Sequence, residues 1–246
     1  MFDFSGKTAL ITGAGSGIGK ATAEYFLSCG AQVAVADIHI AALEAVAREL
    51  DPSGARVASC KYDASDSGSA AELVGSAVAR FGSLDYLVAG AGIYAQQNVP
   101  EMSDDQWHRM ISVNLDGIFY ITRRAIPHMN EGGAFVTVAS VAAHQGGTYG
   151  NAHYGASKGG ILAYTKGLAR EVAPRLRANT VSPGWVETPM VSASLQRGGP
   201  ELLKGIPLQR VGKPREIASV IAFLCSDAAS FITGEAIIAA GGAYMG

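Results

Sequence analysis

The chain has 246 residues, of which 48% are hydrophobic, enough to build one large core or two small ones. Its 19 basic and 21 acidic residues give a formal net charge of −2. Neither sign forms a long run, so the charge pattern excludes the basic surface typical of proteins that bind nucleic acid or anionic membranes.

The N-terminal residues lack the pattern of a signal peptide, and no stretch approaches the roughly 20 apolar residues that span a bilayer. The three cysteines, Cys29, Cys60 and Cys225, are scattered and form no Cys-x-x-Cys pair. Such spacing favours reduced thiols inside a cell over a disulfide framework. We therefore expect a cytoplasmic protein with no nucleic-acid or membrane partner.

Short runs rich in β-branched residues alternate with longer Ala-rich stretches of helical period. The runs predict seven strands, at 8–12, 32–37, 56–63, 84–89, 134–140, 177–182 and 235–240. Parallel neighbours need helical crossovers, so this alternation is typical of a parallel sheet covered on both faces. No linker or repeat interrupts it. The chain is therefore expected to form a single Rossmann-type domain over 1–246, an α/β doubly wound fold with a seven-stranded parallel sheet.

One stretch, at 189–207, departs from this alternation. It is rich in Gly and Pro and has no strand pattern. Long irregular loops on rigid scaffolds often close over a site. We expect this segment to be a mobile substrate lid.

A glycine-rich loop follows the first predicted strand and opens the first helix. Its glycines Gly13, Gly17 and Gly19 follow a G-x-x-x-G-x-G spacing, with Ser16 and Ile18 between them. Glycines at a helix N-terminus let a phosphate approach backbone N–H groups. The loop therefore predicts a pyrophosphate site, although a turn with only a folding role is the alternative.

Asp37 ends the second predicted strand, near the point where a carboxylate accepts hydrogen bonds from an adenosine ribose. A 2′-phosphate there would be repelled. Ile38 and His39 provide no Arg or Lys to counter that repulsion, and position 16 is Ser rather than a basic residue, so the sequence favours NAD over NADP. The alternative is that Asp37 only caps the helix that follows.

Tyr154 and Lys158 stand at i and i+4 of a predicted helical stretch over 149–173, so their side chains share one face. A nearby ammonium stabilises a phenolate and lowers the pKa of a tyrosine toward a range useful for proton transfer. Ser140 is expected to end the fifth strand, at the sheet edge where open α/β folds bind ligands.

The glycine loop, Asp37, Ser140, the Tyr-x-x-x-Lys pair and the run SPGWVETP occur in this order. Together they resemble the short-chain dehydrogenase/reductase family over essentially the whole chain. The resemblance implies that Tyr154 is the acid/base, that Lys158 lowers its pKa and binds the nicotinamide ribose, and that Ser140 orients the substrate oxygen.

The resemblance assigns further residues. Asn114 matches a helix asparagine whose backbone helps to hold a water in a proton relay to the lysine; without the family it would be read as an ordinary buried amide. The implied cofactor contacts are Asp63 and Ala64 at the adenine, and Pro183, Val186 and Thr188 near the nicotinamide.

Two positions depart from the family pattern. At Ala89 to Gly92 the chain has AGAG where the family often has N-N-A-G, so only backbone contacts from Ala89 and Gly90 are expected. This departure concerns the stability of the sheet more than the chemistry. Ala240 replaces an acidic residue that often precedes two glycines, and no functional conclusion follows.

The resulting hypothesis is an NAD-dependent oxidoreductase that interconverts a secondary alcohol and a ketone, with no metal. One alternative is an NADPH-dependent 3-oxoacyl carrier-protein reductase, and another is a dinucleotide-sensing regulator without turnover. The resemblance also implies a homotetramer. The residues expected to line the substrate pocket are Tyr94, His144, Gln145, Tyr149, His153, Trp185 and the lid.

Overall fold

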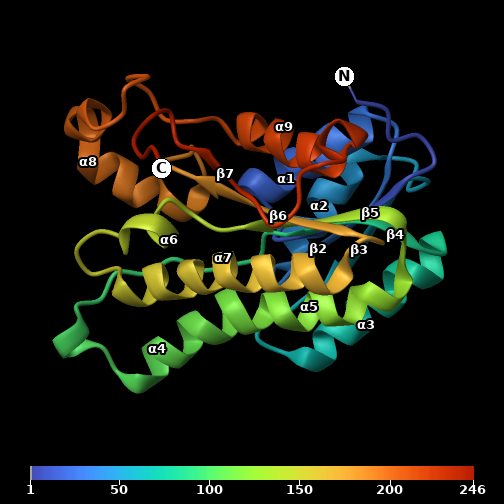
Figure 1. Cartoon of the computed structure of the whole chain (residues 1–246), viewed down its shortest axis with the longest axis horizontal. Coiled ribbons are helices and arrows are strands. Elements are labelled where there is room, and N and C mark those ends of the chain that lie inside the picture. The colour runs from blue at the N-terminus through green and yellow to red at the C-terminus, as the bar shows by residue number, and fades with distance from the viewer. Residues whose placement is uncertain (1) are drawn as a thin grey trace.

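The computed structural model describes residues 2–246 and contains one seven-stranded sheet in which every paired neighbour is parallel (Figure 1). The strand order is β3-β2-β1-β4-β5-β6-β7. The strands are β1 (Thr8–Thr12), β2 (Gln32–Asp37), β3 (Val57–Lys61), β4 (Leu84–Ala89), β5 (Met129–Val138), β6 (Arg177–Pro183) and β7 (Ala236–Ala239). This confirms the predicted doubly wound fold and its seven strands.

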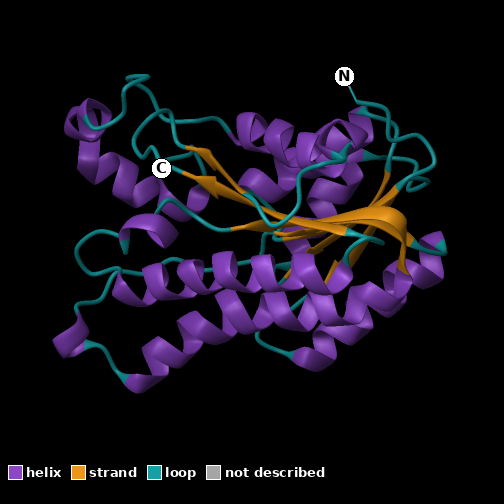
Figure 2. Ribbon diagram, viewed as in Figure 1, coloured by secondary structure: helices purple, strands orange, loops and turns teal. Residues whose placement is uncertain are grey.

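Helices cover both faces of the sheet (Figure 2). The α-helices are α1 (Gly17–Ser28), α2 (Ile40–Leu50), α3 (Ser67–Phe81), α4 (Asp104–Ile111), α5 (Gly117–Ala125), α6 (Ala142–Gln145), α7 (Ala152–Val172), α8 (Ser192–Lys204) and α9 (Pro214–Cys225). Short 3-10 turns occur at Val99–Glu101, Ile126–His128, Pro189–Val191 and Asp227–Ala229, and Ser112–Asp116 is π-helical. Helices α1, α2 and α9 lie on one face, and α3, α4, α5 and α7 lie on the other (Figure 1).

Each face of the sheet has its own apolar core. Phe26 of α1 and Ile221 of α9 pack against one face, and Leu73 of α3, Ile121 of α5 and Leu168 of α7 pack against the other. Burial on both faces explains why the strands are nearly continuous apolar runs rather than alternating ones.

Several element boundaries differ from the sequence-based expectation, and two of the differences bear on the site. Strand β5 ends at Val138, so Ser140 lies in the loop beyond it rather than at its end. Helix α7 begins at Ala152 rather than at 149, because Gly150 has a φ of +76°, outside the helical region.

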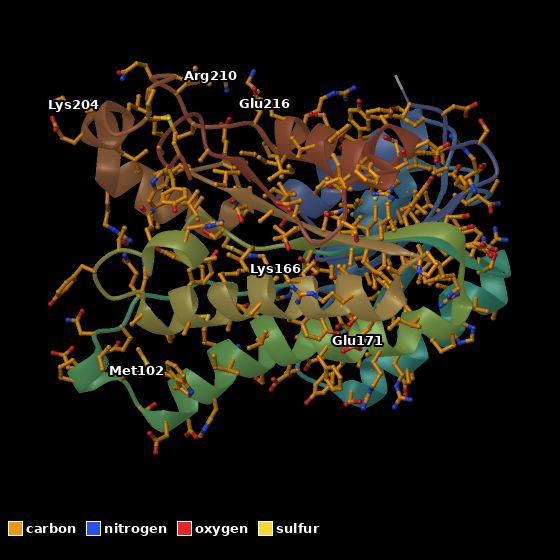
Figure 3. All side chains as sticks on the ribbon, viewed as in Figure 1. Met102, Lys166, Glu171, Lys204, Arg210 and Glu216 are labelled. Atoms are coloured by element: carbon orange, nitrogen blue, oxygen red, sulfur yellow. The ribbon has the colours of Figure 1, made fainter. Side chains whose placement is uncertain are left out.

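The segment 189–207 is mostly helical, which the sequence did not predict. A 3-10 turn precedes α8, and α8 contains a break at Gly199, with a φ of +48°, followed by Pro200. The Gly-Pro pair divides the helix into two short pieces, so the sequence lacks a long helical period. After this segment, Arg210 and Glu216 form an ion pair at 2.6 Å beside the start of α9 (Figure 3).

Within residues 2–246, none of the helices combines the length and the apolar character needed to cross a membrane.

Candidate active site

The main cavity lies at the carboxyl ends of the strands, around the point between β1 and β4 where the strand order reverses, and has a volume of about 960 Å³. Open α/β sheets bind ligands at this place because adjacent crossovers diverge there. The predicted site residues that line the cavity are Gly13, Ser16, Gly17, Ile18, Gly19, Asp37, Asp63, Ala64, Gly90, Ser140, Tyr154, Lys158, Pro183, Val186 and Thr188.

Two predicted residues do not line the cavity. Ala89 is 2% exposed inside β4, and Asn114 is fully buried between helices. Backbone contacts to a ligand are therefore available from Gly90 and Ala91, which do line the cavity, but not from Ala89.

The glycine loop fits closely against its neighbours. Gly13 has a φ of +72°, and a Cβ on it would lie 2.9 Å from the carbonyl oxygen of Gly90. A Cβ on Gly15 would lie 2.9 Å from Cγ of Asp37. Gly15 has no predicted role in the sequence pattern. Only the three-dimensional structure shows that a side chain at this position would collide with Asp37.

The N-terminus of α1 has no side-chain cap. Its N-cap residue Ser16 makes no capping hydrogen bond, and the first turn has no acidic residue. The free N–H groups of that turn and the positive end of the helix dipole therefore suit an anionic group at this wall of the cavity.

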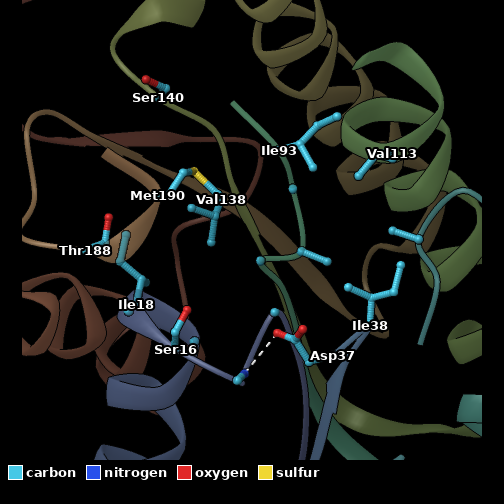
Figure 4. A pocket seen from close by; sticks show the side chains of 18 of the residues that line it. Ser16, Ile18, Asp37, Ile38, Ile93, Val113, Val138, Ser140, Thr188 and Met190 are labelled. Carbon is cyan, nitrogen blue, oxygen red and sulfur yellow. Dashed lines mark hydrogen bonds between the residues drawn. The ribbon is translucent and has the colours of Figure 1, made fainter. Parts of the chain in front are cut away.

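The Asp37 carboxylate points toward the glycine loop (Figure 4). Its Oδ2 accepts a hydrogen bond from the N–H of Gly15 at 3.0 Å, and its Oδ1 accepts one from the N–H of His39 at 3.0 Å. Since His39 precedes α2, Asp37 does not cap a residue inside that helix. The carboxylate is thus held at the cavity wall, with Ile38 beside it (Figure 4).

Lys158 is 6% exposed, and its Nζ donates a hydrogen bond to the carbonyl of Val138 at 2.9 Å. Burial lowers the pKa of Lys158 to about 8, so the ammonium still predominates at pH 7. Its Nζ lies 5.7 Å from the ring centroid of Tyr154.

The expected lowering of the pKa of Tyr154 is absent from this cofactor-free geometry. Burial raises the pKa of Tyr154 to about 12, and only a hydrogen bond with the Ser140 hydroxyl acts in the opposite direction. The reason is that Lys158 is bound to the Val138 carbonyl instead of to the phenol, and desolvation disfavours the phenolate.

Tyr94 packs edge-on against Tyr154, with ring centroids 5.1 Å apart. The Tyr94 hydroxyl lies 3.1 Å from the side-chain amide of Asn151, which precedes α7. These contacts limit the positions that the Tyr154 ring can adopt.

Asn114 lies in the π-helical turn between α4 and α5. Its Oδ1 accepts from the N–H of Ile93 at 2.8 Å, and its Nδ2 donates to the Ile93 carbonyl at 3.0 Å and to Ser157 Oγ at 3.1 Å. The side chain therefore ties the loop after β4 to the helix that carries Tyr154 and Lys158. π-Helical turns are frequent at functional sites.

Thr12 compensates for the asparagines missing at Ala89 and Gly90. Its Oγ1 accepts hydrogen bonds from the N–H groups of Gly90 and Ala91, both at 3.1 Å. A threonine at the end of β1 thus satisfies the backbone at the end of β4.

The residues expected to line the substrate pocket are mostly elsewhere. His153 is 1% exposed, its Nδ1 has no hydrogen-bond partner, and burial lowers its pKa. Tyr149 is 85% exposed, and Trp185 lines a second cavity beside β7. Between residues 2 and 246, no group of three or more His, Cys, Asp or Glu side chains is arranged to hold a metal ion.

Several cavity residues were not predicted because their helix reaches the site only through tertiary packing. Asp105, Arg109, Ser112 and Val113 come from α4 and the π-helical turn. From the start of the 189–207 segment, Met190 and Val191 also line the cavity, and Met190 projects toward Val138 (Figure 4). No local sequence signal identifies these residues.

Comparisons with known proteins agree with this site. A family model described as enoyl-(acyl carrier protein) reductase matches residues 13–244. A 3-oxoacyl-(acyl-carrier-protein) reductase of Thermotoga maritima is 40% identical, and the match covers 96% of this chain and 97% of that one. A cyclohexanol dehydrogenase of an Acinetobacter strain is 38% identical, with coverage of 97% and 95%.

The crystal structure of a short-chain dehydrogenase/reductase from Brucella melitensis, described as glucose/ribitol dehydrogenase, is 50% identical. It superimposes with a TM-score of 0.97 and covers 100% of this chain and 99% of that one. Because the family model matches residues 13–244 and these relatives cover nearly the whole chain, the chain belongs to the short-chain dehydrogenase/reductase family, whose members are oxidoreductases that bind a nicotinamide dinucleotide.

Proposed function

We propose that this chain interconverts a secondary alcohol and a ketone with NAD, and that Tyr154 is the acid/base. The observation that carries this proposal is the arrangement of one cavity, which has Asp37 and the uncapped α1 terminus at one end and Ser140, Tyr154 and Lys158 at the other.

The residues present fit the dinucleotide. The loop is built of glycines at positions where a Cβ would collide with backbone atoms or with Asp37. Without side chains at these positions, the loop leaves room for a pyrophosphate at the N-terminus of α1. Asp37 would hold the adenosine ribose, Asp63 and Ala64 the adenine, and Lys158 the nicotinamide ribose, with Pro183, Val186 and Thr188 around the carboxamide. When bound, NAD supplies the hydride acceptor and a positive charge near Tyr154.

Proton handling falls to the side chains of this chain. In the oxidative direction the Tyr154 oxygen accepts the hydroxyl proton of the substrate, while the Ser140 hydroxyl holds the substrate oxygen by a hydrogen bond. Together with the positive charge of the bound nicotinamide, the Lys158 ammonium would offset the burial that raises the pKa of Tyr154. Asn114 secures the helix that carries both residues. In the reductive direction the Tyr154 hydroxyl returns the proton to the ketone oxygen.

The preference for NAD rests on the charge of Asp37. A 2′-phosphate would meet this carboxylate, and the two residues that follow it, Ile38 and His39, include no Arg or Lys. Like charges at close range are strongly unfavourable. The variant Asp37→Ala is expected to raise kcat/KM for NADP relative to NAD by at least about tenfold. If the ratio of kcat/KM for NADP to kcat/KM for NAD stayed unchanged in Asp37→Ala, Asp37 would not determine the cofactor preference.

The comparisons favour a 3-oxoacyl thioester as substrate over a simple alcohol. The names of similar proteins include several 3-oxoacyl-(acyl-carrier-protein) reductases, against one cyclohexanol dehydrogenase and one structure described as glucose/ribitol dehydrogenase. The second candidate function is therefore an NADPH-dependent 3-oxoacyl carrier-protein reductase. It has the stronger support from relatives, whereas Asp37 supports NAD as the cofactor.

One experiment separates the candidates. Nicotinamide absorbance is followed with NAD(H) and NADP(H) in parallel, against secondary alcohols, polyols, hydroxysteroids and 3-hydroxyacyl and 3-oxoacyl thioesters, with Tyr154→Phe as the control. NAD-linked turnover that disappears in the control supports the first proposal. NADPH-linked thioester reduction supports the second, and tight NAD binding with no turnover in the whole panel supports the regulator.

Three wider features are part of the proposal. The chain acts as one domain with 189–207 as its substrate lid, it functions in the cytoplasm on a small molecule, and it assembles as a homotetramer. Exposed apolar side chains support the assembly: Phe231 is exposed before β7, and Trp107 and Phe119 are exposed on α4 and α5.

A further inference from the structure

Ser140 is held at the start of a helix that is too short to be stable alone. Its Oγ accepts a hydrogen bond from the N–H of Ala142 at 3.2 Å, and its carbonyl accepts one from the N–H of Ala143 at 2.9 Å. Helix α6 has only four residues, and isolated helices of this length do not persist in water. The direction of the Ser140 hydroxyl therefore depends on whatever anchors α6.

The N–H of Val141, just before α6, donates to the carbonyl of Pro183 at 3.0 Å, and the side chain that anchors the other end of α6 is that of His144. Its Nε2 forms a hydrogen bond with Oγ of Ser182 at 3.0 Å, and Ser182 is fully buried in β6. The His144 ring stacks on Tyr244, with centroids 5.2 Å apart and an angle of 28° between the planes. One side chain thus joins α6 to the sheet and to the C-terminal tail.

Tyr244 is itself fixed by the fold. The tail leaves β7, and within it the N–H of Ala243 donates to the carbonyl of Ala240 at 3.1 Å. The carbonyl of Gly241 accepts a hydrogen bond from the N–H of Leu208 at 3.1 Å, at the end of the lid segment. The marked C-terminus lies close to α6 in Figure 1, in agreement with the ring contact.

We propose that His144 and Tyr244 are positioning residues, which hold α6 against β6 and the C-terminal tail and thereby direct the Ser140 hydroxyl toward Tyr154 and the substrate oxygen. The inference rests on the proposed role of Ser140. Neither His144 nor Tyr244 lines the main cavity, so both act through α6 rather than by touching the substrate.

The first test compares variants of the two rings. Tyr244→Ala removes the stack, and His144→Phe keeps an aromatic ring but loses the hydrogen bond to Ser182. Each is expected to lower kcat about tenfold, because small displacements of an orienting group are costly in rate. The Kd for NAD is expected to stay within about twofold, since the cofactor contacts lie elsewhere.

Two further variants serve as controls. Tyr244→Phe retains the stacking ring and is expected to restore kcat, while Met245→Ala changes an exposed neighbour in the same tail and is expected to leave kcat unchanged. Equal losses in Tyr244→Ala and Met245→Ala would show a general effect of the tail and overturn the proposal.

A double-mutant cycle separates this inference from the proposed function. If Tyr244 acts through Ser140, Tyr244→Ala has little further effect in a Ser140→Ala background. Additive losses overturn the inference and leave the function intact. If Ser140→Ala turns over substrate as fast as the parent protein, the proposed role of Ser140 itself is contradicted.

Hydrogen exchange provides a readout that needs no substrate. Tyr244→Ala is expected to speed amide exchange in 140–146 at least about tenfold while leaving the core strands protected. Unchanged exchange in that segment would show that the tail does not hold α6 and would overturn the inference.

Discussion

At the scale of single residues, the buried Lys158 combines a functional charge with a cost in stability. Its nitrogen has one protein acceptor, the Val138 carbonyl, and desolvation lowers its pKa to about 8 from 10.5. Groups tuned for catalysis often lower the stability of the folded state in this way.

Lys158→Met is therefore expected to abolish turnover and to raise the free energy of unfolding near pH 7, by at most about 3 kcal/mol. Below pH 8 lysine is protonated in both folded and unfolded states, so the penalty is fully present there. It decreases between pH 8 and 10.5 and vanishes above, because the folded pKa is the lower one. Denaturant unfolding of both proteins at pH 7 and pH 10 measures this difference, and a gap that grew with pH would contradict the sign.

Thr12 provides a second prediction at this scale. Thr12→Val would leave the N–H groups of Gly90 and Ala91 without their protein acceptor. Since both residues line the cavity, the expected cost is the net value of two ordinary hydrogen bonds, about 1–3 kcal/mol. Thermal unfolding is expected to show that loss. Thr8→Val, in the same strand, is the matched control, and an equal loss in both variants would show a general effect of valine in β1.

At the scale of elements, helix α8, in the segment proposed as the substrate lid, is connected to the loop after β4. Nη2 of Arg197 donates to Gln96 Oε1 and to Ser194 Oγ, both at 3.1 Å. The loop that holds Gln96 also contacts the approach to α7, since the N–H of Gln97 donates to the Gly150 carbonyl at 2.8 Å. The contact thus links the lid to the segment before Tyr154.

Arg197→Ala is expected to raise KM for the substrate about 2- to 10-fold, the value of one exposed hydrogen bond, with little change in melting temperature. Steady-state kinetics at saturating cofactor measure it. Lys204→Ala removes a charge from the same helix, where Lys204 pairs with Glu201 at 2.6 Å (Figure 3). If Arg197→Ala and Lys204→Ala raise KM equally, the effect comes from the lost positive charge on α8 and the contact with Gln96 is not its cause.

Local pattern predicted most elements but not all of their ends. Strand runs and the glycine loop were recognisable because their signals are short and contiguous. The break at Gly199 and Pro200 concealed α8, since two half-helices lack a long period. The early end of β5 at Val138 and the late start of α7 depended on backbone conformations that composition does not specify.

At the scale of the whole molecule, light scattering is expected to give a mass about four times the 25.3 kDa of one chain. The physical reason is the exposed apolar side chains, which include Phe231 at 103% exposure before β7 and Trp107 and Phe119, each at 41%, on α4 and α5. Phe231→Ser is expected to shift the distribution toward smaller species at low concentration. A parent protein that runs as a monomer would contradict the assembly.

The order of the motifs was sufficient to identify the fold class, the family and the Tyr154–Lys158 pair, because strand period, glycine turns and i, i+4 spacing are local properties of the chain. Tertiary structure alone decided which of the predicted groups share a cavity, that Ala89 and Asn114 do not line it, and that α4 does. It also decided the protonation of the site, since the raised pKa of Tyr154 and the lowered pKa of Lys158 come from burial. Burial and the Val138 contact arise only when segments distant in sequence pack together, which is why no local pattern contains them.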